Sequence, residues 1–160
     1  MTTVVVLVLL VVVAAVVAGM VVVRNGKRDY ARANEVVPGA ATRAPAEWAG
    51  AHTPEARLHR RLRDAVEALR TNPAMEDAWM LDARVSLEQH ALAVDERLIA
   101  VAALPERVRA EPMAGVAAAV DAVEVAVASM ATAGPEPERR SSLDQAMADV
   151  EERVALLAEG

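Results

Sequence analysis

An uncharged run of twenty residues, 4–23, constrains this chain more than any other feature. At 1.5 Å rise per residue, a helix over this run is about 30 Å long, the thickness of the hydrocarbon core of a bilayer. Lipid offers the backbone no hydrogen-bond partners, so a helix is the form that such a segment adopts there. The run is too long for the apolar part of a secretory signal peptide, and no charged side chain precedes it. We therefore predict an uncleaved transmembrane helix.

Basic residues follow this run directly and indicate its orientation. They are Arg24, Lys27, Arg28 and Arg32. Cytoplasmic flanks of membrane helices carry an excess of Lys and Arg, so this flank is expected in the cytoplasm and the N-terminus outside. One lysine against sixteen arginines in the whole chain is typical of a GC-rich bacterial genome. The predicted location is therefore a bacterial plasma membrane, crossed once.

Small residues recur inside the run at a spacing of four. Ala14 pairs with Ala18, and Ala15 pairs with Gly19. Such pairs let two membrane helices approach closely. Alanine is common in this chain, so chance also explains the spacing, and a homo-oligomer through this face is left open.

Charge is distributed unevenly along the chain. Residues 24–63 hold nine Lys or Arg against four Asp or Glu, which gives +5, and residues 64–160 hold eight against nineteen, which gives −11. Anionic lipid attracts the first part and repels the second. An alternative is that the acidic excess only keeps the domain in solution. The acidic balance, without aromatic residues among the arginines, argues against nucleic acid as a partner.

The chain divides into three predicted parts. Residues 1–34 form the membrane helix with its basic extension, residues 35–53 form a linker, and residues 54–160 form a helical domain. The linker contains Pro38, Gly39, Pro45 and Gly50 and shows no helical periodicity. We expect its one large apolar residue, Trp48, to dock on the domain rather than to sit at the bilayer surface.

Apolar periodicity predicts the helices of the domain. Thr53-Pro54-Glu55 is a strong helix start, and Asn72-Pro73 ends that helix. Further helices are expected over 75–104, 113–132 and 138–157, with a short stretch at 105–110 that Pro112 interrupts. The repeating apolar positions are Leu58, Leu62, Ala65 and Leu69; Met80, Leu87, Val94 and Val101; Ala78, Val85, Leu92 and Ile99; Met113, Val116, Val120, Val123, Val127 and Met130; and Leu143, Met147, Val150, Val154 and Leu157. Short connections favour antiparallel neighbours, so we predict an all-α antiparallel bundle of about four helices.

Signatures of site chemistry are absent from the sequence. There is no cysteine, no Gly-rich phosphate loop and no serine-nucleophile motif, and the three histidines lack Glu-x-x-His spacing. The sequence therefore predicts no metal, no cofactor and no enzymatic activity. Asp121 and Glu124 form the one carboxylate pair of interest. We expect a buried structural ion pair with an arginine such as Arg84 or Arg97, or plain exposure to solvent. An acid/base or ligand site there is the alternative.

Four arginines cluster in the first helix of the domain: Arg57, Arg60, Arg61 and Arg63. They are expected to form a solvated face, with Arg60–Asp64 and Arg63–Glu67 as pairs one turn apart. The alternative is contact with anionic lipid or with an acidic partner.

The sequence favours a membrane-anchored helical bundle that acts as an interaction or scaffold module at the inner face of the plasma membrane. Its expected partners are the lipid bilayer and another protein or a second copy of the chain. One alternative is an accessory subunit of a larger membrane complex. The other is a ligand-binding sensor or enzyme that uses the Asp121/Glu124 region.

Overall fold

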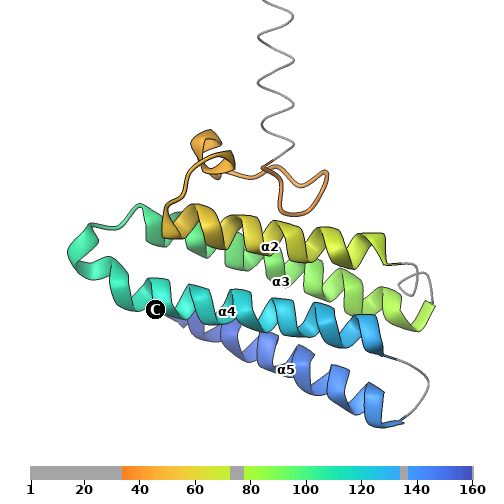
Figure 1. The fold of residues 1–160 in the computed structure, drawn as a ribbon. Coiled ribbons are helices and arrows are strands. Elements are labelled where there is room, and N and C mark those ends of the chain that lie inside the picture. Colours follow the sequence, from red (N-terminus) through yellow and green to blue (C-terminus); the bar gives the residue numbers. More distant parts are fainter. Residues whose placement is uncertain (1–33, 73–77, 134–136, 160) are drawn as a thin grey trace, which may run out of the picture.

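The computed structural model describes residues 34–72, 78–133 and 137–159, which form a helical bundle (Figure 1). Within these ranges the elements are the 3₁₀ helix η1 (Ala46–Ala49) and the α-helices α2 (Pro54–Thr71), α3 (Ala78–Ala102), α4 (Glu106–Thr132) and α5 (Pro137–Glu159), with no strand. The predicted all-helical bundle is confirmed for this part. The predicted membrane helix, its four flanking basic residues and its small-residue pairs lie outside the described residues.

The four α-helices run up and down in turn, so consecutive helices are antiparallel (Figure 1). The helices α3 and α4 contact each other, and both also contact α2 and α5. The helices α2 and α5 therefore lie on opposite sides of a central pair. This is the arrangement that short connections between amphipathic helices favour.

The start of α2 follows the prediction. The Thr53 hydroxyl oxygen accepts a hydrogen bond from the Ala56 backbone N–H at 3.3 Å, and Pro54 occupies the first helical position. The helix ends at Thr71, where Asn72 becomes extended. The four predicted apolar positions on this helix are all buried. Local capping chemistry and one apolar face thus suffice to define α2.

The core follows one of the two predicted stripes on α3. Its first stripe, from Met80 to Val101, is at most 1% exposed. The second stripe departs from prediction, because Val85 is 46% exposed and Leu92 and Ile99 are only half-buried. Ala91, Asp95 and Leu98 are buried instead, since α3 meets α2, α4 and α5 over a broader arc than two heptad lines cover.

Pro112 does not interrupt a helix, contrary to the prediction. The helix α4 runs from Glu106 through Pro112 to Thr132. A proline inside a helix removes one backbone hydrogen bond and costs about 3 kcal/mol. Contacts around the first turn hold this stretch in place: Arg109 donates to the Leu104 carbonyl at 3.1 and 2.6 Å and to Glu55 at 3.0 Å. The buried seam that follows Pro112 anchors the rest of the helix.

Within the described ranges, α4 is the one helix long and apolar enough to cross a membrane, judged by length and composition alone, with a mean hydropathy of 1.6. A core helix of a bundle meets the same criterion. Val116, Val120 and Val123 of α4 are fully buried against neighbouring helices. Packing in the bundle thus accounts for its apolar composition.

Residues 34–51 lie folded across the bundle beside α2 (Figure 1). The segment turns at Gly39, whose φ of +91° suits a residue without a side chain. The Gly39 N–H donates to the Glu35 carboxylate at 2.8 Å. Val36 and Trp48 are buried, at 1% and 7% exposure, so the expected docking of Trp48 is confirmed.

Candidate functional site

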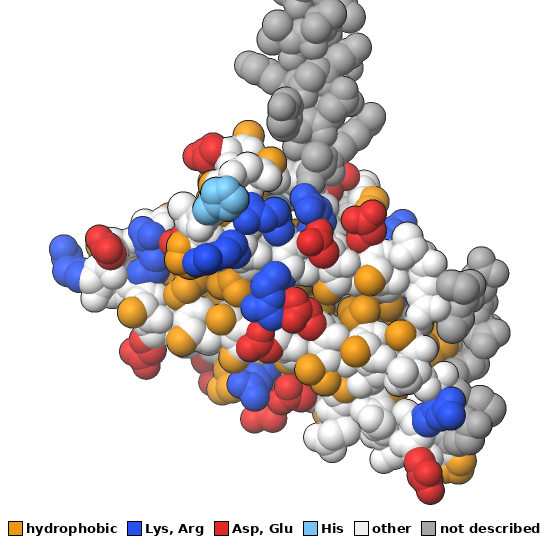
Figure 2. Space-filling model, viewed as in Figure 1, with side chains coloured by type: hydrophobic (Ala, Val, Ile, Leu, Met, Phe, Trp, Pro, Cys, Tyr) orange, Lys and Arg blue, Asp and Glu red, His pale blue; other side chains and the backbone are white. Residues whose placement is uncertain are grey.

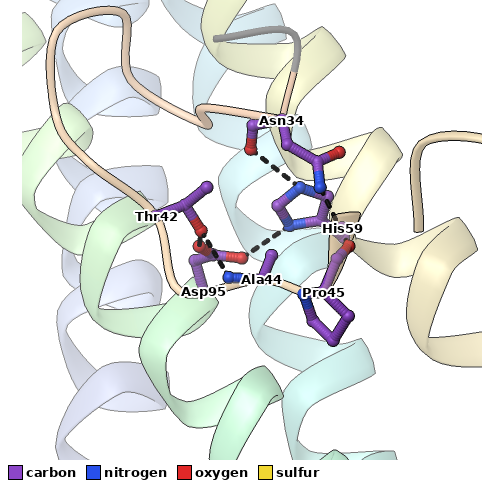
Figure 3. A network of polar contacts seen from close by, with 6 residues as sticks. All are labelled: Asn34, Thr42, Ala44, Pro45, His59 and Asp95. Atoms are coloured by element: carbon purple, nitrogen blue, oxygen red, sulfur yellow. Dashed lines mark hydrogen bonds and ion pairs between the residues drawn. The ribbon is translucent and has the colours of Figure 1, made fainter. Parts of the chain in front are cut away.

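A buried pair of polar side chains lies beneath residues 34–51 (Figure 3). His59 comes from α2 and Asp95 from α3, two helices that pack side by side. The His59 Nδ1 lies 2.7 Å from the Asp95 Oδ1. Their side chains are 0% and 4% exposed, so both groups are removed from water. Such a pair is costly to bury unless every polar atom finds a partner.

The segment above supplies those partners, as Figure 3 shows. The His59 Nε2 lies 3.0 Å from the Asn34 backbone oxygen. The Thr42 hydroxyl donates to the Asp95 Oδ2 at 2.9 Å and accepts from the Ala44 N–H at 3.0 Å. The Asn34 side-chain amide donates to the Pro45 carbonyl at 3.0 Å. We call Asn34, Thr42, His59 and Asp95 the buried cluster; it joins the segment to two helices.

The hydrogen bonds of His59 define how many protons the buried cluster holds. A backbone carbonyl only accepts, so Nε2 carries a hydrogen. An ionised Asp95 also only accepts, so Nδ1 then carries a hydrogen too and His59 is an imidazolium. In a second form, Asp95 is protonated and donates to the Nδ1 of a neutral His59. This form also keeps both hydrogen bonds of the His59 ring, to Asp95 and to the Asn34 carbonyl. In either form the pair has no net charge, which is the condition for burying it at low cost.

Two further contacts close the buried cluster off from water. The Trp48 ring meets the His59 ring edge-on, with centroids 5.6 Å apart and an interplanar angle of 62°. Arg60 donates to the carbonyls of Trp48 and Ala51, at 2.9 and 2.7 Å. The segment is thus fastened from Asn34 to Ala51, and its carbonyls near η1 are satisfied by a side chain of α2.

The geometry of the buried cluster suits holding rather than catalysis. The Thr42 hydroxyl donates to Asp95, so it is not aligned with the histidine as a nucleophile. The principal cavities of the described part are lined by other residues, and none of them reaches His59 or Asp95. Across residues 34–72, 78–133 and 137–159, no three metal-ligating side chains lie close enough to hold an ion. The buried cluster therefore positions a segment of the chain.

The structure confirms that Asp121 and Glu124 pair with an arginine and that they are exposed, whereas their predicted burial and the two arginines named for them were wrong. Their side chains are 62% and 38% exposed rather than buried. Their partner is Arg61 of α2, not Arg84 or Arg97: Arg61 donates to Asp121 at 2.6 Å and to both Glu124 oxygens at 2.9 and 2.5 Å. The α2–α4 contact, which periodicity alone does not specify, brings these groups together. Hydrogen bonding to Glu124, and then to Asp121, raises the pKa of Arg61 above its usual value.

The four clustered arginines of α2 have different roles. Arg60 satisfies two backbone carbonyls instead of pairing with Asp64, and Arg63 contacts Asp64 at 2.8 and 3.2 Å. Arg61 bridges to α4. Arg57 is exposed, and no hydrogen bond or ion pair links its side chain to the described residues. Figure 2 accordingly shows basic and acidic side chains side by side on this face rather than one large basic patch.

The sequence patterns did not reveal the buried cluster, although a local signal for it exists. His59, Leu62, Val66 and Leu69 share one face of α2, and Asp95 stands between the buried Val94 and Leu98 of α3. A polar residue inside a broad apolar face suggests a buried, partnered group. Its partner cannot be identified from spacing, because 36 residues separate His59 from Asp95.

Comparison of the chain with protein-family models, with curated proteins and with solved structures finds no match.

Proposed function

We propose that this chain is a single-pass membrane protein whose helical bundle is held at a fixed place beside the inner face of the membrane, where it serves as an interaction or scaffold module. The docked segment 34–51 carries this proposal. Because this segment is packed on the bundle, it does not act as a flexible linker. The bundle can then move less relative to the predicted membrane helix. A module that only needed tethering would have no use for a buried cluster beneath its connecting segment.

Chain length supports a position close to the bilayer. Ten residues, 24–33, separate the apolar run from Asn34. If they continue the predicted helix, they span about 15 Å. The bundle then lies just beyond the lipid headgroups, whose region adds about 5–8 Å to each side of the hydrocarbon core.

Charge supports the same orientation of the bundle. The docked segment and α2, residues 34–72, hold six basic and five acidic residues, a balance of +1. The remaining described residues, 78–133 and 137–159, hold seven basic and fourteen acidic residues, a balance of −7. Anionic headgroups favour the first part and repel the second. The side of α2 is therefore the one that this proposal places toward the membrane.

Sidedness is tested by thiol labelling, which the absence of cysteine in the chain makes clean. Gln145→Cys on the exposed face of α5 should react with a membrane-impermeant maleimide only after bacterial cells are permeabilised. The matched control Thr2→Cys should react in intact cells. Labelling of Gln145→Cys in intact cells would place the bundle outside and overturn the proposed location.

A second experiment tests whether the bundle keeps a fixed orientation relative to the membrane. It uses fluorophores at the exposed positions Ala68 of α2 and Gln145 of α5. In vesicles with a headgroup-linked quencher, fluorescence at position 68 should be quenched more than at position 145. Equal quenching at both positions would mean that the bundle tumbles freely on a loose tether.

An accessory role in a larger membrane complex is distinguished by its stoichiometry. Purification of the full chain in mild detergent should then yield one partner in a fixed ratio, retained through gel filtration. A scaffold module instead releases its partners under the same conditions.

A further inference from the structure

A cleft of about 360 Å³ opens between α3, α4 and α5. Its lining residues belong to the end of the bundle where α3 connects to α4 and where α5 ends, and Figure 1 shows how the backbone runs there. Six of its lining residues define its charge and shape: Arg97, Glu111, Gly115, Arg153, Leu156 and Leu157. The volume lies within the range of small-molecule sites, about 300–1,000 Å³. The cleft shares no residue with the buried cluster. It also shares none with the Arg61 bridge, by which we mean the contacts of Arg61 with Asp121 and Glu124.

Arg97 is the unusual member of this lining. It is half-buried, and its Nε is enclosed without a hydrogen-bond partner. No ion pair or hydrogen bond joins the Arg97 side chain to any part of the chain that the structure describes. Other half-buried arginines are satisfied, as Arg84 is by Glu88 and Arg109 by Glu55 and Leu104. The enclosed Nε fixes the guanidinium in place, and its two terminal nitrogens have no partner among the described residues, so they are the donors available to an acceptor from outside the chain.

The rest of the cleft combines a second cation with apolar walls. Arg153 reaches Asp149 at 3.4 Å, a long contact between side chains that are both 43% exposed, so it remains able to bind another anion. Glu111 is the one acidic lining residue and offsets part of this positive charge. Leu156 is 58% exposed and Leu157 is half-buried, which leaves apolar surface facing the cleft.

Gly115 keeps the cleft open on the side of α4. A Cβ built at this position would lie 3.4 Å from the Leu157 Cδ2, so a methyl group is tolerated but a longer side chain would occupy the cleft. Glycine in a helix interior costs about 0.5–1 kcal/mol relative to alanine.

We infer that this cleft binds a small anion with an apolar chain, such as a medium-chain carboxylate or an alkyl phosphate. The anionic head accepts hydrogen bonds from Arg97 and Arg153, and the chain lies on Leu156, Leu157 and the helix surface at Gly115. Charge-assisted hydrogen bonds are the strong ones in such sites, and apolar contact adds affinity with each methylene. This site does not depend on the membrane anchor, so it stands apart from the function proposed above.

The inference is tested with a diazirine derivative of octanoate, photo-cross-linked to the full chain in phosphatidylcholine nanodiscs. We expect labelled peptides from residues 111–118 and 153–157, with labelling competed by free octanoate. Octyl phosphate is the second arm, because it distinguishes a phosphate from a carboxylate preference. Acetate and octanol, which carry only the head or only the chain, should compete poorly.

Variants connect the labelling to the proposed residues. Arg97→Met should weaken competition by octanoate about tenfold or more, because a charge-assisted contact is lost. Gly115→Leu should abolish specific labelling by filling the cleft. The matched control Arg107→Met, at an exposed arginine of α4, should leave labelling unchanged.

A stability readout separates ligand binding from a structural role of Arg97. Arg97→Met removes an unsatisfied enclosed donor, so without ligand the variant should melt at the same temperature as the wild type or higher. A lower melting temperature together with unchanged octanoate competition would show a structural arginine and overturn the inference. Labelling that is equal in wild type and Arg97→Met, or that maps outside residues 111–118 and 153–157, would also overturn it.

Discussion

The buried cluster and the contacts of Arg61 with Asp121 and Glu124 are both polar networks that join parts of the chain distant in sequence, yet they differ in exposure to water. His59 and Asp95 are 0% and 4% exposed, whereas Arg61, Asp121 and Glu124 are 42%, 62% and 38% exposed. Water competes for the hydrogen bonds of the exposed Arg61, Asp121 and Glu124 side chains, so these ion pairs contribute little to the free energy of unfolding. It cannot reach the buried pair, so each lost partner there leaves an unsatisfied group. The buried cluster, not the arginine-rich surface, therefore determines how residues 34–51 are held on the bundle.

Removal of Asp95 should produce the largest effect. Asp95→Ala leaves the His59 Nδ1 and the Thr42 hydroxyl without their acceptor, and breaking a buried pair from one side costs about 3–5 kcal/mol. Urea unfolding followed by circular dichroism measures the loss for the full chain in detergent. Tryptic cleavage after Arg43 in the docked segment should also become faster, because the segment is released.

Asp95→Asn is the matched control for that variant. Its amide nitrogen can donate to the Nδ1 of a neutral His59 that keeps its hydrogen on Nε2, and its amide oxygen can accept from Thr42. Each contact of the buried cluster is then retained without charge, so the loss should stay below about 1 kcal/mol. Equal losses for the alanine and asparagine variants would show that hydrogen bonding in this cluster does not hold the segment.

Thr42→Val should cost about 1–2 kcal/mol, because the hydroxyl links Asp95 to the Ala44 N–H and valine has nearly the same shape. Thr42→Ser keeps the hydroxyl and should recover most of the loss. In an Asp95→Ala background the cost of Thr42→Val should be smaller, since the contact to Asp95 is already gone and only the hydrogen bond from the Ala44 N–H remains to be lost. Additive losses in this double-mutant cycle would mean that the two residues act independently.

Sequence patterns predicted those parts of the fold that depend on neighbours along the chain. Thr53-Pro54-Glu55 defines the start of α2 through local capping, and the seam from Met113 to Met130 follows helical spacing. Pro112 misled the prediction because tertiary contacts of Arg109 and the downstream seam outweigh a local preference. Local rules thus describe elements well and their interruptions less well.

The site was harder to predict because it depends on pairs that are distant in sequence. The docking of residues 34–51 rests on contacts 9 to 53 residues apart, between groups that carry no shared motif. Asp121 and Glu124 were correctly expected to pair with an arginine, but which helix supplies it depends on how α2 and α4 pack. The docking of Trp48 could be predicted because burial of a large aromatic side chain on the domain removes much apolar surface from water.

Arg61→Met tests the contribution of the exposed network of Arg61, Asp121 and Glu124 to stability. The loss should be about 1 kcal/mol or less, despite three short contacts, because the three side chains are largely solvated. High salt should reduce the difference further, since exposed charges are screened. A double-mutant cycle with Glu124→Gln isolates the pair. A loss as large as that of Asp95→Ala would remove the distinction between the two networks.

The smallest effect is expected at Glu55, which lies between the two networks in character: its side chain is 13% exposed, and its partner Arg109 is 30% exposed. Hydrogen bonding to its own backbone N–H, aided by Thr53 and Arg109 and opposed by burial, lowers the pKa of Glu55 below its usual value of 4.5. A lowered folded-state pKa contributes stability above the unfolded-state pKa, and this stability is lost as the pH falls through the folded-state value.

Glu55→Gln keeps a hydrogen-bond acceptor for Arg109 and removes only the charge, so the loss at neutral pH should be about 0.5 kcal/mol. Unfolding free energies measured from neutral to acidic pH should converge for wild type and variant at the acidic end. Glu138→Gln, at an exposed first-turn acid of α5, is the control and should show a smaller difference throughout. A difference that persists unchanged at acidic pH would assign the role of Glu55 to packing of its side chain and not to its charge.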